Sequence, residues 1–432
     1  MTNKIIEILL WFIFLGSFIN PDLITLPFER RINYIFVQGA GIMIILISLS
    51  YIRYIKLYKR FNKGYILILP ILIICLIGLI CGRIIGYSSV VAWIFNSLLV
   101  YSAAILILLP AQVDLHERIL VTLKNQYLFV ILFGLYSLTT SINVQDILIN
   151  KDLWVESYEK VSIVLLLGLV PFYIGYTVGV KNKQLSILTV IGYLVLIIIG
   201  LRGTSRATFI VNFIVIPISF FLLCWRSRNF KNLKGKAIWL LCGLILIGIV
   251  FTLQPDILTR SGIKDAWQET LWRLTWYREW TGVESMQAGL VERINWEISH
   301  SRGLEGEDFL SSLTIFDYFI GKGFGVPWIS TLWNREWDIV HSGPLHLIYK
   351  GGIPLLIVYL AITLSALSAA WRNAVSNPVA MGCFVYLVCW LARFISYGAH
   401  VSSYYNYVFW LIVGFALATD IQIQRTSTLQ VD

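Results

Sequence analysis

The chain has 432 residues, of which 58% are apolar and only 13% are charged, and its mean hydropathy is +0.76. These values exclude an ordinary soluble globular protein, in which about a quarter of the residues are charged. The net charge of +10 does not predict nucleic-acid binding, because most Lys and Arg residues lie in short segments between apolar runs, where they act as topology signals. Those runs are about 17–25 residues long, which is enough to cross a bilayer. The sequence therefore predicts an all-α polytopic membrane protein.

About twelve transmembrane helices are predicted from these runs. Nine of them fall in residues 1–253 and three in residues 343–432. Their approximate ranges are 5–25, 33–52, 64–82, 88–110, 119–142, 161–180, 185–201, 207–225, 237–253, 343–371, 379–398 and 405–420. Residues 254–342 separate the two groups, and we expect them to form one large extracytoplasmic loop with amphipathic helices.

The distribution of basic residues predicts the orientation of the chain. Segments 53–63 and 226–236 are rich in Lys and Arg, and with twelve spans both fall on the same side as the two termini. The positive-inside rule makes that side cytoplasmic. The first apolar run contains Glu7 and lacks a cleavage pattern, so we expect a retained helix rather than a signal peptide.

The sequence offers no pattern that predicts a cofactor. It has no P-loop, no dinucleotide fingerprint and no cluster of acids or histidines with metal-ligand spacing. The six cysteines all lie within apolar runs, and we interpret them as buried side chains without a disulfide or metal role. They are Cys75, Cys81, Cys224, Cys242, Cys383 and Cys389. We therefore predict neither a metal nor a cofactor.

The long loop is rich in tryptophan and arginine. It holds eight of the sixteen tryptophans, and a loop with so many aromatic side chains is not expected to be disordered. Within 265–280, tryptophans recur once per helical turn, which predicts an amphipathic helix at the membrane surface. These rings either anchor the loop at the headgroup level or stack against sugars beside an active site.

Arginines at the outer side of the membrane are candidates for binding an anion. Arg202 and Arg206 join two spans on that side, where the positive-inside rule disfavours basic residues. Ser205 can cap the helix that follows, and arginines beside a helix N-terminus make an anion site. The alternative is that both contact lipid phosphates.

His341 is the strongest candidate for a catalytic base. It lies where the long loop enters an apolar helix, and a histidine with an ordinary pKa near 6.5 can accept a proton at neutral pH. A structural hydrogen-bonding role is the alternative. His346, Lys350 and His400 are weaker candidates.

These elements resemble the superfamily of bacterial O-antigen ligases and Wzy-type O-antigen polymerases. A Ser-Arg pair opens a mid-chain span in the family, and Ser205-Arg206 matches it. An Arg-x-x-Trp element and a Gly-x-Gly turn follow in the outer loop, as at 293–296 and 321–325. A histidine, Asn or Ser, nine residues and a glycine complete the pattern, matched by His341, Ser342 and Gly352. The chain departs from the family at Leu355, usually a small residue, and at Lys350, often an acid.

The resemblance implies a GT-C-like membrane fold and a metal-independent inverting glycosyltransferase at the outer face of the bacterial inner membrane. The donor would be a polyprenyl-diphosphate-linked glycan, and the acceptor another glycan or lipid A-core. His341 would be the catalytic base, and Arg206 and Arg293 would bind the diphosphate, with Arg202 as a further candidate. Because the segment between Arg293 and the Gly-x-Gly turn is longer than usual, Arg278 or Arg273 is an alternative counterpart.

Two other functions remain open at this stage. A flippase-like transporter of lipid-linked glycans also has about twelve spans, but it usually has short loops, internal repeats and ionisable residues at mid-membrane. Here the clearest such residue is Arg393. A protein O-oligosaccharyltransferase is the third possibility, and the sequence does not separate polymerase from ligase.

Overall fold

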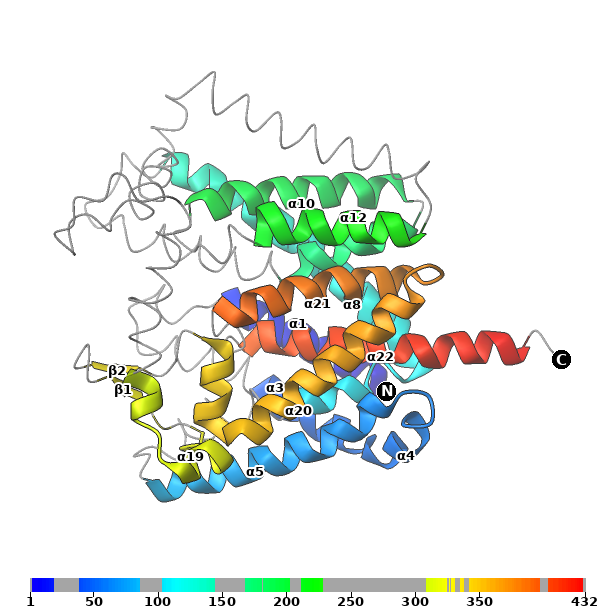
Figure 1. Cartoon of the computed structure of the whole chain (residues 1–432). Coiled ribbons are helices and arrows are strands. Elements are labelled where there is room, and N and C mark those ends of the chain that lie inside the picture. The colour runs from blue at the N-terminus through cyan, green and yellow to red at the C-terminus, as the bar shows by residue number, and fades with distance from the viewer. Residues whose placement is uncertain are drawn as a thin grey trace.

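The computed structural model is predominantly helical (Figure 1). It describes residues 2–18, 39–85, 103–143, 168–180, 182–202, 211–227, 308–324, 326, 328–330, 335–337, 342–396 and 403–429. The helices and strands are α1 (Thr2–Phe18), α3 (Ala40–Leu49), η2 (Ile52–Tyr54), α4 (Ile55–Tyr58), η3 (Lys63–Leu67), α5 (Ile68–Ile85), η5 (Ala103–Leu108), α8 (Val113–Asn143), α10 (Lys183–Arg202), η7 (Val211–Val215), α12 (Ile216–Ser227), α19 (Ile315–Ile320), β1 (Trp328–Ser330), β2 (Arg335–Trp337), α20 (Gly343–Asn373), α21 (Pro378–Ser396) and α22 (Ser403–Leu429). Helical residues also occur at 168–179 and 308–311.

Several of these helices can cross a membrane. Within the described ranges, four are long and apolar enough, and a bent pair formed by Ala40–Leu49 and Ile52–Tyr58 would make five. The four are Lys63–Gly82, Val113–Leu135, Gly343–Asn373 and Pro378–Ile395. The chain is thus a helical membrane protein, whereas the predicted total of twelve spans depends partly on ranges that the structure does not describe.

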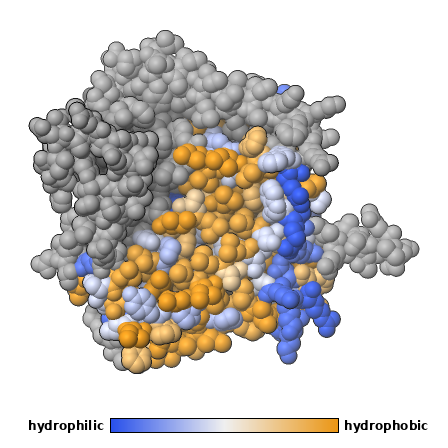
Figure 2. Space-filling model, in the orientation of Figure 1, coloured by the Kyte–Doolittle hydropathy of each residue, from blue (hydrophilic) through white to orange (hydrophobic). Residues whose placement is uncertain are grey.

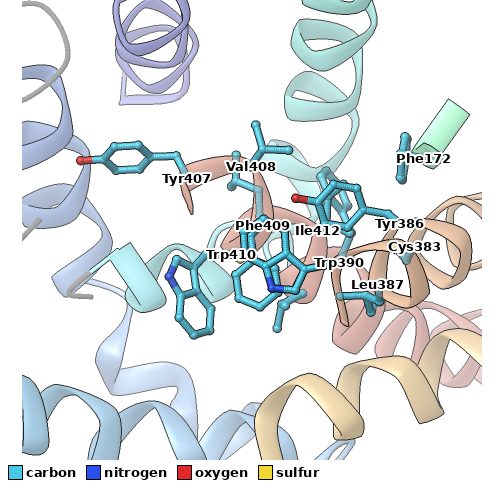
Figure 3. Close-up of a cluster of buried hydrophobic side chains, with 14 of the residues drawn as sticks. Phe172, Cys383, Tyr386, Leu387, Trp390, Tyr407, Val408, Phe409, Trp410 and Ile412 are labelled. Carbon is cyan, nitrogen blue, oxygen red and sulfur yellow. The ribbon is translucent and has the colours of Figure 1, made fainter. Parts of the chain in front are cut away.

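The core is built around α22, which packs against α20, α21 and η5. Aromatic rings fill the centre: Trp390 stacks on Phe409 with ring centroids 4.2 Å apart, and Trp410 lies beside them (Figure 3). The indole N–H of Trp390 donates to the hydroxyl of Tyr359, 2.8 Å away. This bond satisfies a polar group in a region without water, where an unpaired donor would be costly.

One end of the bundle carries the basic residues. Figure 1 shows α4 and the C-terminal end of α20 at this end, and Figure 2 shows a hydrophilic band there beside a broad apolar surface. The exposed residues of this band include Arg53, Lys56, Lys59, Arg60 and Lys63. The opposite end carries α19, β1 and β2 (Figure 1). The basic segment 53–63 and the end of the long loop therefore lie at opposite ends of the bundle, as the predicted topology requires.

A polar junction holds the basic end together. The carboxylate of Asp420 in α22 accepts hydrogen bonds from Asn62 at 2.7 Å, Arg372 at 2.8 Å and Asn373 at 2.7 Å. Asn62 also caps η3 through the N–H of Gly64. One carboxylate thus links the turn before α5 to α20 and α22.

The described residues are almost all helical, as predicted, except for a short antiparallel pair, β1 and β2, in which Trp328 faces Trp337. The structure corrects two expectations about local structure. The span predicted at 343–371 is not one continuous helix, since it breaks at Gly351 and Gly352. The span predicted at 119–142 begins earlier, at Val113.

Candidate functional site

Most of the predicted site residues lie outside the described residues. This holds for His341, Arg206, Arg278 and Arg293. Arg202 is the last residue of α10. The structure does describe the Gly-x-Gly turn, and it describes the residues after His341, which form the rest of the predicted histidine motif.

The helix that follows His341 begins as a short arm. Ser342 is its N-cap residue and Pro344 stands in the first turn, a position that suits proline because its missing N–H is not needed there. The arm runs from Gly343 to Lys350 across the end of the bundle, whereas the rest of α20 runs along it (Figure 1). At its start, a Cβ on Gly343 would lie 2.3 Å from the carbonyl oxygen of Phe394. The arm therefore begins in close contact with the end of α21.

The break in α20 depends on two glycine conformations. Gly352 has φ 72° and ψ −179°, and Gly321 has φ 78° and ψ 169°, a region that only glycine occupies readily. A Cβ on Gly352 would lie 2.5 Å from the carbonyl carbon of Phe319, and one on Gly321 would lie 2.6 Å from that of Lys350. The backbone after α19 and the backbone of the break thus pack directly on each other, with no room for a side chain between them.

Hydrogen bonds fix the Gly-x-Gly turn in this position. The N–H of Lys322 donates to the carbonyl of Tyr349 at 2.7 Å, and the N–H of Phe324 donates to the carbonyl of Gly78 in α5 at 2.9 Å. The first bond joins the turn to the last residues of the short arm. The turn therefore connects the short arm of α20 to α5.

Lys350 has a structural role at the break. Its side chain is buried, and its ammonium group donates to the carbonyl of Val326 at 2.7 Å. The same group lies 5.2 Å from the centre of the Tyr349 ring, a distance that allows a cation–π contact. The positive charge of Lys350 lies at the C-terminal end of the short arm, where a cation interacts favourably with the helix dipole.

Asp317 and Lys322 form a second charged pair beside the break. Asp317 accepts from the N–H and the hydroxyl of Thr314, each at 2.7 Å, and from the ammonium of Lys322 at 2.8 Å. Thr314 and Asp317 complete a capping box at the start of α19. Burial alone would raise the pKa of the Asp317 carboxyl, but the hydrogen bonds from Lys322 and Thr314 outweigh it and hold that pKa below its usual value.

A small aromatic cluster supports the loop side of the arm. Phe309, Trp328 and Tyr349 pack together, with ring centroids 5.8 Å apart for Phe309 and Trp328 and 5.5 Å for Phe309 and Tyr349. Trp328 is almost fully buried. This tryptophan therefore packs as core, and its ring does not serve as a platform for a sugar.

Arg393 lies near the end of its helix, in the last turn of α21, beside the residue that contacts Gly343. It is buried, and a cation in the last turn of a helix interacts favourably with the helix dipole. The expectation of an ionisable residue at mid-membrane is therefore wrong for Arg393. It belongs instead to the end of the bundle at which the short arm begins.

The helices on either side of the Ser-Arg motif pack against each other. The hydroxyl of Tyr193 in α10 donates to the carbonyl of Asn212 at 2.6 Å, and the amide of Asn212 donates to the carbonyl of Leu196 at 3.3 Å. Asn212 lies in η7, a π-helical turn, which is frequently found at functional sites. These bonds hold α10 against η7.

The remaining histidine candidates and the cysteines form no further site among the described residues. His346, a weaker candidate, is buried in the short arm; His400 lies outside the described part of the chain. Cys75, Cys383 and Cys389 are buried and free, and Cys81 is free and partly exposed. Among the described residues, no three His, Cys, Asp or Glu side chains come together as a metal site.

Two features of this region were missed in the sequence although it contained their signals. Thr314-Ile-Phe-Asp317 has the spacing of a capping box. Gly351-Gly352 precedes Pro354 by two residues, and such a combination breaks helices. Both signals lie at the point where α19 meets α20.

Replacing Asp317 with asparagine is expected to alter acid stability. A carboxyl with a lowered pKa stabilises the folded state at neutral pH, and this contribution disappears as the pH falls from the unfolded value, near 3.9, through the folded one. We expect Asp317→Asn to cost about 1 kcal/mol at pH 7, because the side chains of the pair keep some contact with solvent, which screens their charges. Melting temperatures in detergent should converge with those of the wild type below pH 4. A constant difference from pH 7 to pH 3 would contradict this assignment.

The chain matches no protein-family model, and no curated protein matches it significantly.

Proposed function

We propose that this protein is a membrane glycan transferase of the O-antigen polymerase or ligase type. It moves a polyprenyl-diphosphate-linked oligosaccharide to a glycan or lipid A-core acceptor at the outer face of a bacterial inner membrane. The basic end of the bundle would face the cytoplasm, and the end with α19 and the short arm of α20 would face outward.

One observation carries this proposal. Two of the three sequence elements that resemble the family, the Gly-x-Gly turn and the glycine that ends the histidine motif, are separated in the sequence yet pack backbone to backbone. Gly321 and Gly352 both adopt conformations that other residues disfavour. One backbone contact therefore requires a glycine at both positions. This common structural role of the two motifs supports the resemblance to the family.

The proposed reaction is a direct displacement at the anomeric carbon of the donor sugar. The acceptor hydroxyl oxygen forms the new bond, and the bond to the diphosphate oxygen breaks as the diphosphate leaves with the electron pair. His341 takes the proton of the acceptor hydroxyl. Arg206 and Arg293 stabilise the departing diphosphate through their planar guanidinium groups, with Arg278 and Arg202 as alternatives. A single displacement inverts the anomeric configuration.

The two lysines beside the break do not compete for this diphosphate role. Lys322 is paired with Asp317, and Lys350 is bonded to the carbonyl of Val326. Both ammonium groups therefore serve the break in α20. This assignment supports the choice of arginines as the diphosphate-binding residues.

The break in α20 also favours a second candidate, a transporter, because broken helices line substrate sites in transporters. Such sites lie near the middle of the membrane. Here the arm of α20 after the break runs from Ile353 to Asn373, which corresponds to roughly 30 Å and by itself crosses the hydrocarbon core. The break therefore lies near one membrane face, as a transferase that works at the surface requires.

Deleting the gene in the source organism tests the proposal and separates its variants. A gel of surface polysaccharides that shows single repeat units on the lipid anchor would identify a polymerase. Polymer retained on its carrier beside bare lipid A-core would identify a ligase, and loss of glycan from a protein would identify an O-oligosaccharyltransferase. Lipid-linked glycan trapped at the cytoplasmic face would contradict the proposal and favour the transporter.

A further inference from the structure

Helix α19 has an inverted distribution of apolar and charged residues. Ile315, Phe316 and Phe319 are 78%, 77% and 65% exposed, whereas Asp317 is only 8% exposed. A helix on the surface of a water-soluble protein would show the opposite pattern. Four large apolar side chains on six residues, when Ile320 is included, also form an exposed patch that needs a partner.

The charges of this region are turned away from the apolar patch and neutralised. Asp317 binds Lys322 and Thr314, and the N–H of Lys322 is bonded to the short arm of α20. The capping box satisfies the start of α19, and the N–H of Gly321 donates to the carbonyl of Asp317 at its end. The exposed side of α19 therefore presents hydrocarbon without an ionised group, which suits a lipid environment.

The patch continues the exposed apolar surface of the neighbouring helices. Helix α19 packs beside α5, and both lie at the lower edge of the bundle in Figure 1. Figure 2 shows this side of the molecule as a broad apolar surface. The exposed apolar residues of the two neighbouring membrane helices include Ile73, Leu76, Ile77 and Ile80 of α5 and Ile353, Ile357 and Leu364 of α20.

We infer that α19 is an interfacial helix whose exposed face, formed by Ile315, Phe316, Phe319 and Ile320, is inserted into the acyl-chain boundary of the membrane leaflet at this end of the bundle. Its occupant is the lipid surface itself. The helix is distinct from the segment 265–280, for which the sequence predicts a similar location. The inference does not depend on the proposed glycan transfer.

Insertion of α19 would also explain what holds the break in α20. The backbone from Phe319 to Gly321 packs on Lys350–Gly352, and Lys322 is bonded to Tyr349. A six-residue helix is too short to be stable on its own. Lipid contact on one face and the break on the other would fix α19 in place, and through it the arm that follows His341.

Lipid photolabelling of the wild-type chain tests this inference. The full-length protein is reconstituted in vesicles of phosphatidylethanolamine and phosphatidylglycerol that contain a phospholipid with a diazirine in its acyl chain. Mass spectrometry then locates the labelled residues. Ile357 serves as the lipid-facing reference and Lys59 as the aqueous reference, and both are exposed on the protein. We expect residues 315–320 to be labelled as strongly as the segment around Ile357, and severalfold above that around Lys59.

Two results would overturn the inference. Labelling of residues 315–320 at the level of Lys59, together with oxidation of Phe316 by hydroxyl radicals in water, would place α19 in solvent. Protection from both reagents would show that a protein surface covers it. As a matched pair, Phe316→Ser should reduce the labelling of α19 severalfold, whereas Phe221→Ser, at a similarly exposed position of α12, should leave it unchanged.

Discussion

Gly352→Ala is expected to destabilise the protein strongly and to reduce its activity. At φ 72° and ψ −179° any other residue is strained by about 1–3 kcal/mol, and the added methyl group would lie 2.5 Å from the carbonyl carbon of Phe319. Neither group can move without separating α19 from α20. We expect a total loss of roughly 2–4 kcal/mol, since overpacking adds to the strain. The melting temperature of the purified protein in detergent measures this loss.

Gly39→Ala is the matched control. Gly39 precedes α3 in a right-handed helical conformation, with φ −61° and ψ −48°, and no heavy atom lies within 4 Å of the Cβ that alanine would add. Alanine is more favourable than glycine in this conformation by up to about 1 kcal/mol. The melting temperature should therefore stay the same or rise. Equal melting temperatures for the two variants would contradict the packing described at the break.

His341→Ala is expected to have the largest effect on activity. If His341 accepts the proton of the acceptor hydroxyl, its removal should slow transfer by about 10²–10⁴-fold, the usual contribution of general base catalysis. The melting temperature should change little. Initial rates of glycan transfer in reconstituted vesicles, compared with those of the wild type, give the measurement.

His341→Gln separates the two roles of this histidine. Glutamine can hold a hydrogen bond but does not take up a proton near neutral pH. If His341 is a base, the glutamine variant should be as slow as the alanine variant, and the wild-type rate should rise as the pH increases through about 6.5. Recovery of most of the activity by glutamine would show a positioning role, and full activity of the alanine variant would exclude both.

The membrane helices were the part of the fold most accessible to sequence analysis. Long apolar runs predicted spans at 343–371 and 379–398, and the structure has helical segments over Gly343–Asn373, with a break at Gly351 and Gly352, and over Pro378–Ser396. This agreement has a physical reason, because the thickness of the bilayer fixes the length of each run. The charge pattern likewise placed segment 53–63 opposite the end of the long loop, and the two lie at opposite ends of the bundle (Figure 1).

The site was less accessible, because its geometry depends on contacts between distant segments. Gly321 and Gly352 were singled out in the sequence, but nothing in their spacing predicts that they pack on each other. Lys350 was a weaker candidate in the sequence, and its bond to the carbonyl of Val326 depends on the fold. Asp317 was one of several single acids in the loop, and its pairing with Lys322 depends on the fold of α19. Tertiary contacts, and not local pattern, determine these roles.

The strand pair and the helix break were missed for different reasons. Residues 328–337 are dominated by tryptophan and charged residues, and a short pair of strands gives only a weak alternating signal. At the break, Lys350, Gly351 and Gly352 form only a short interruption between apolar residues. A helix predicted from hydropathy therefore continues through the break, whereas the backbone conformation of the two glycines interrupts it.

The central claim, that this protein transfers glycans from a polyprenyl diphosphate, is tested most directly with the purified wild-type chain in vesicles. The donor is the lipid-linked glycan isolated from the deletion strain, supplied with and without its acceptor, and the products are separated by mass spectrometry and chromatography. We expect consumption of the donor, release of free polyprenyl diphosphate and one new glycosidic bond of inverted configuration, with the same rate in the presence of a metal chelator. Movement of intact donor across the bilayer, with no polyprenyl diphosphate released, would contradict it.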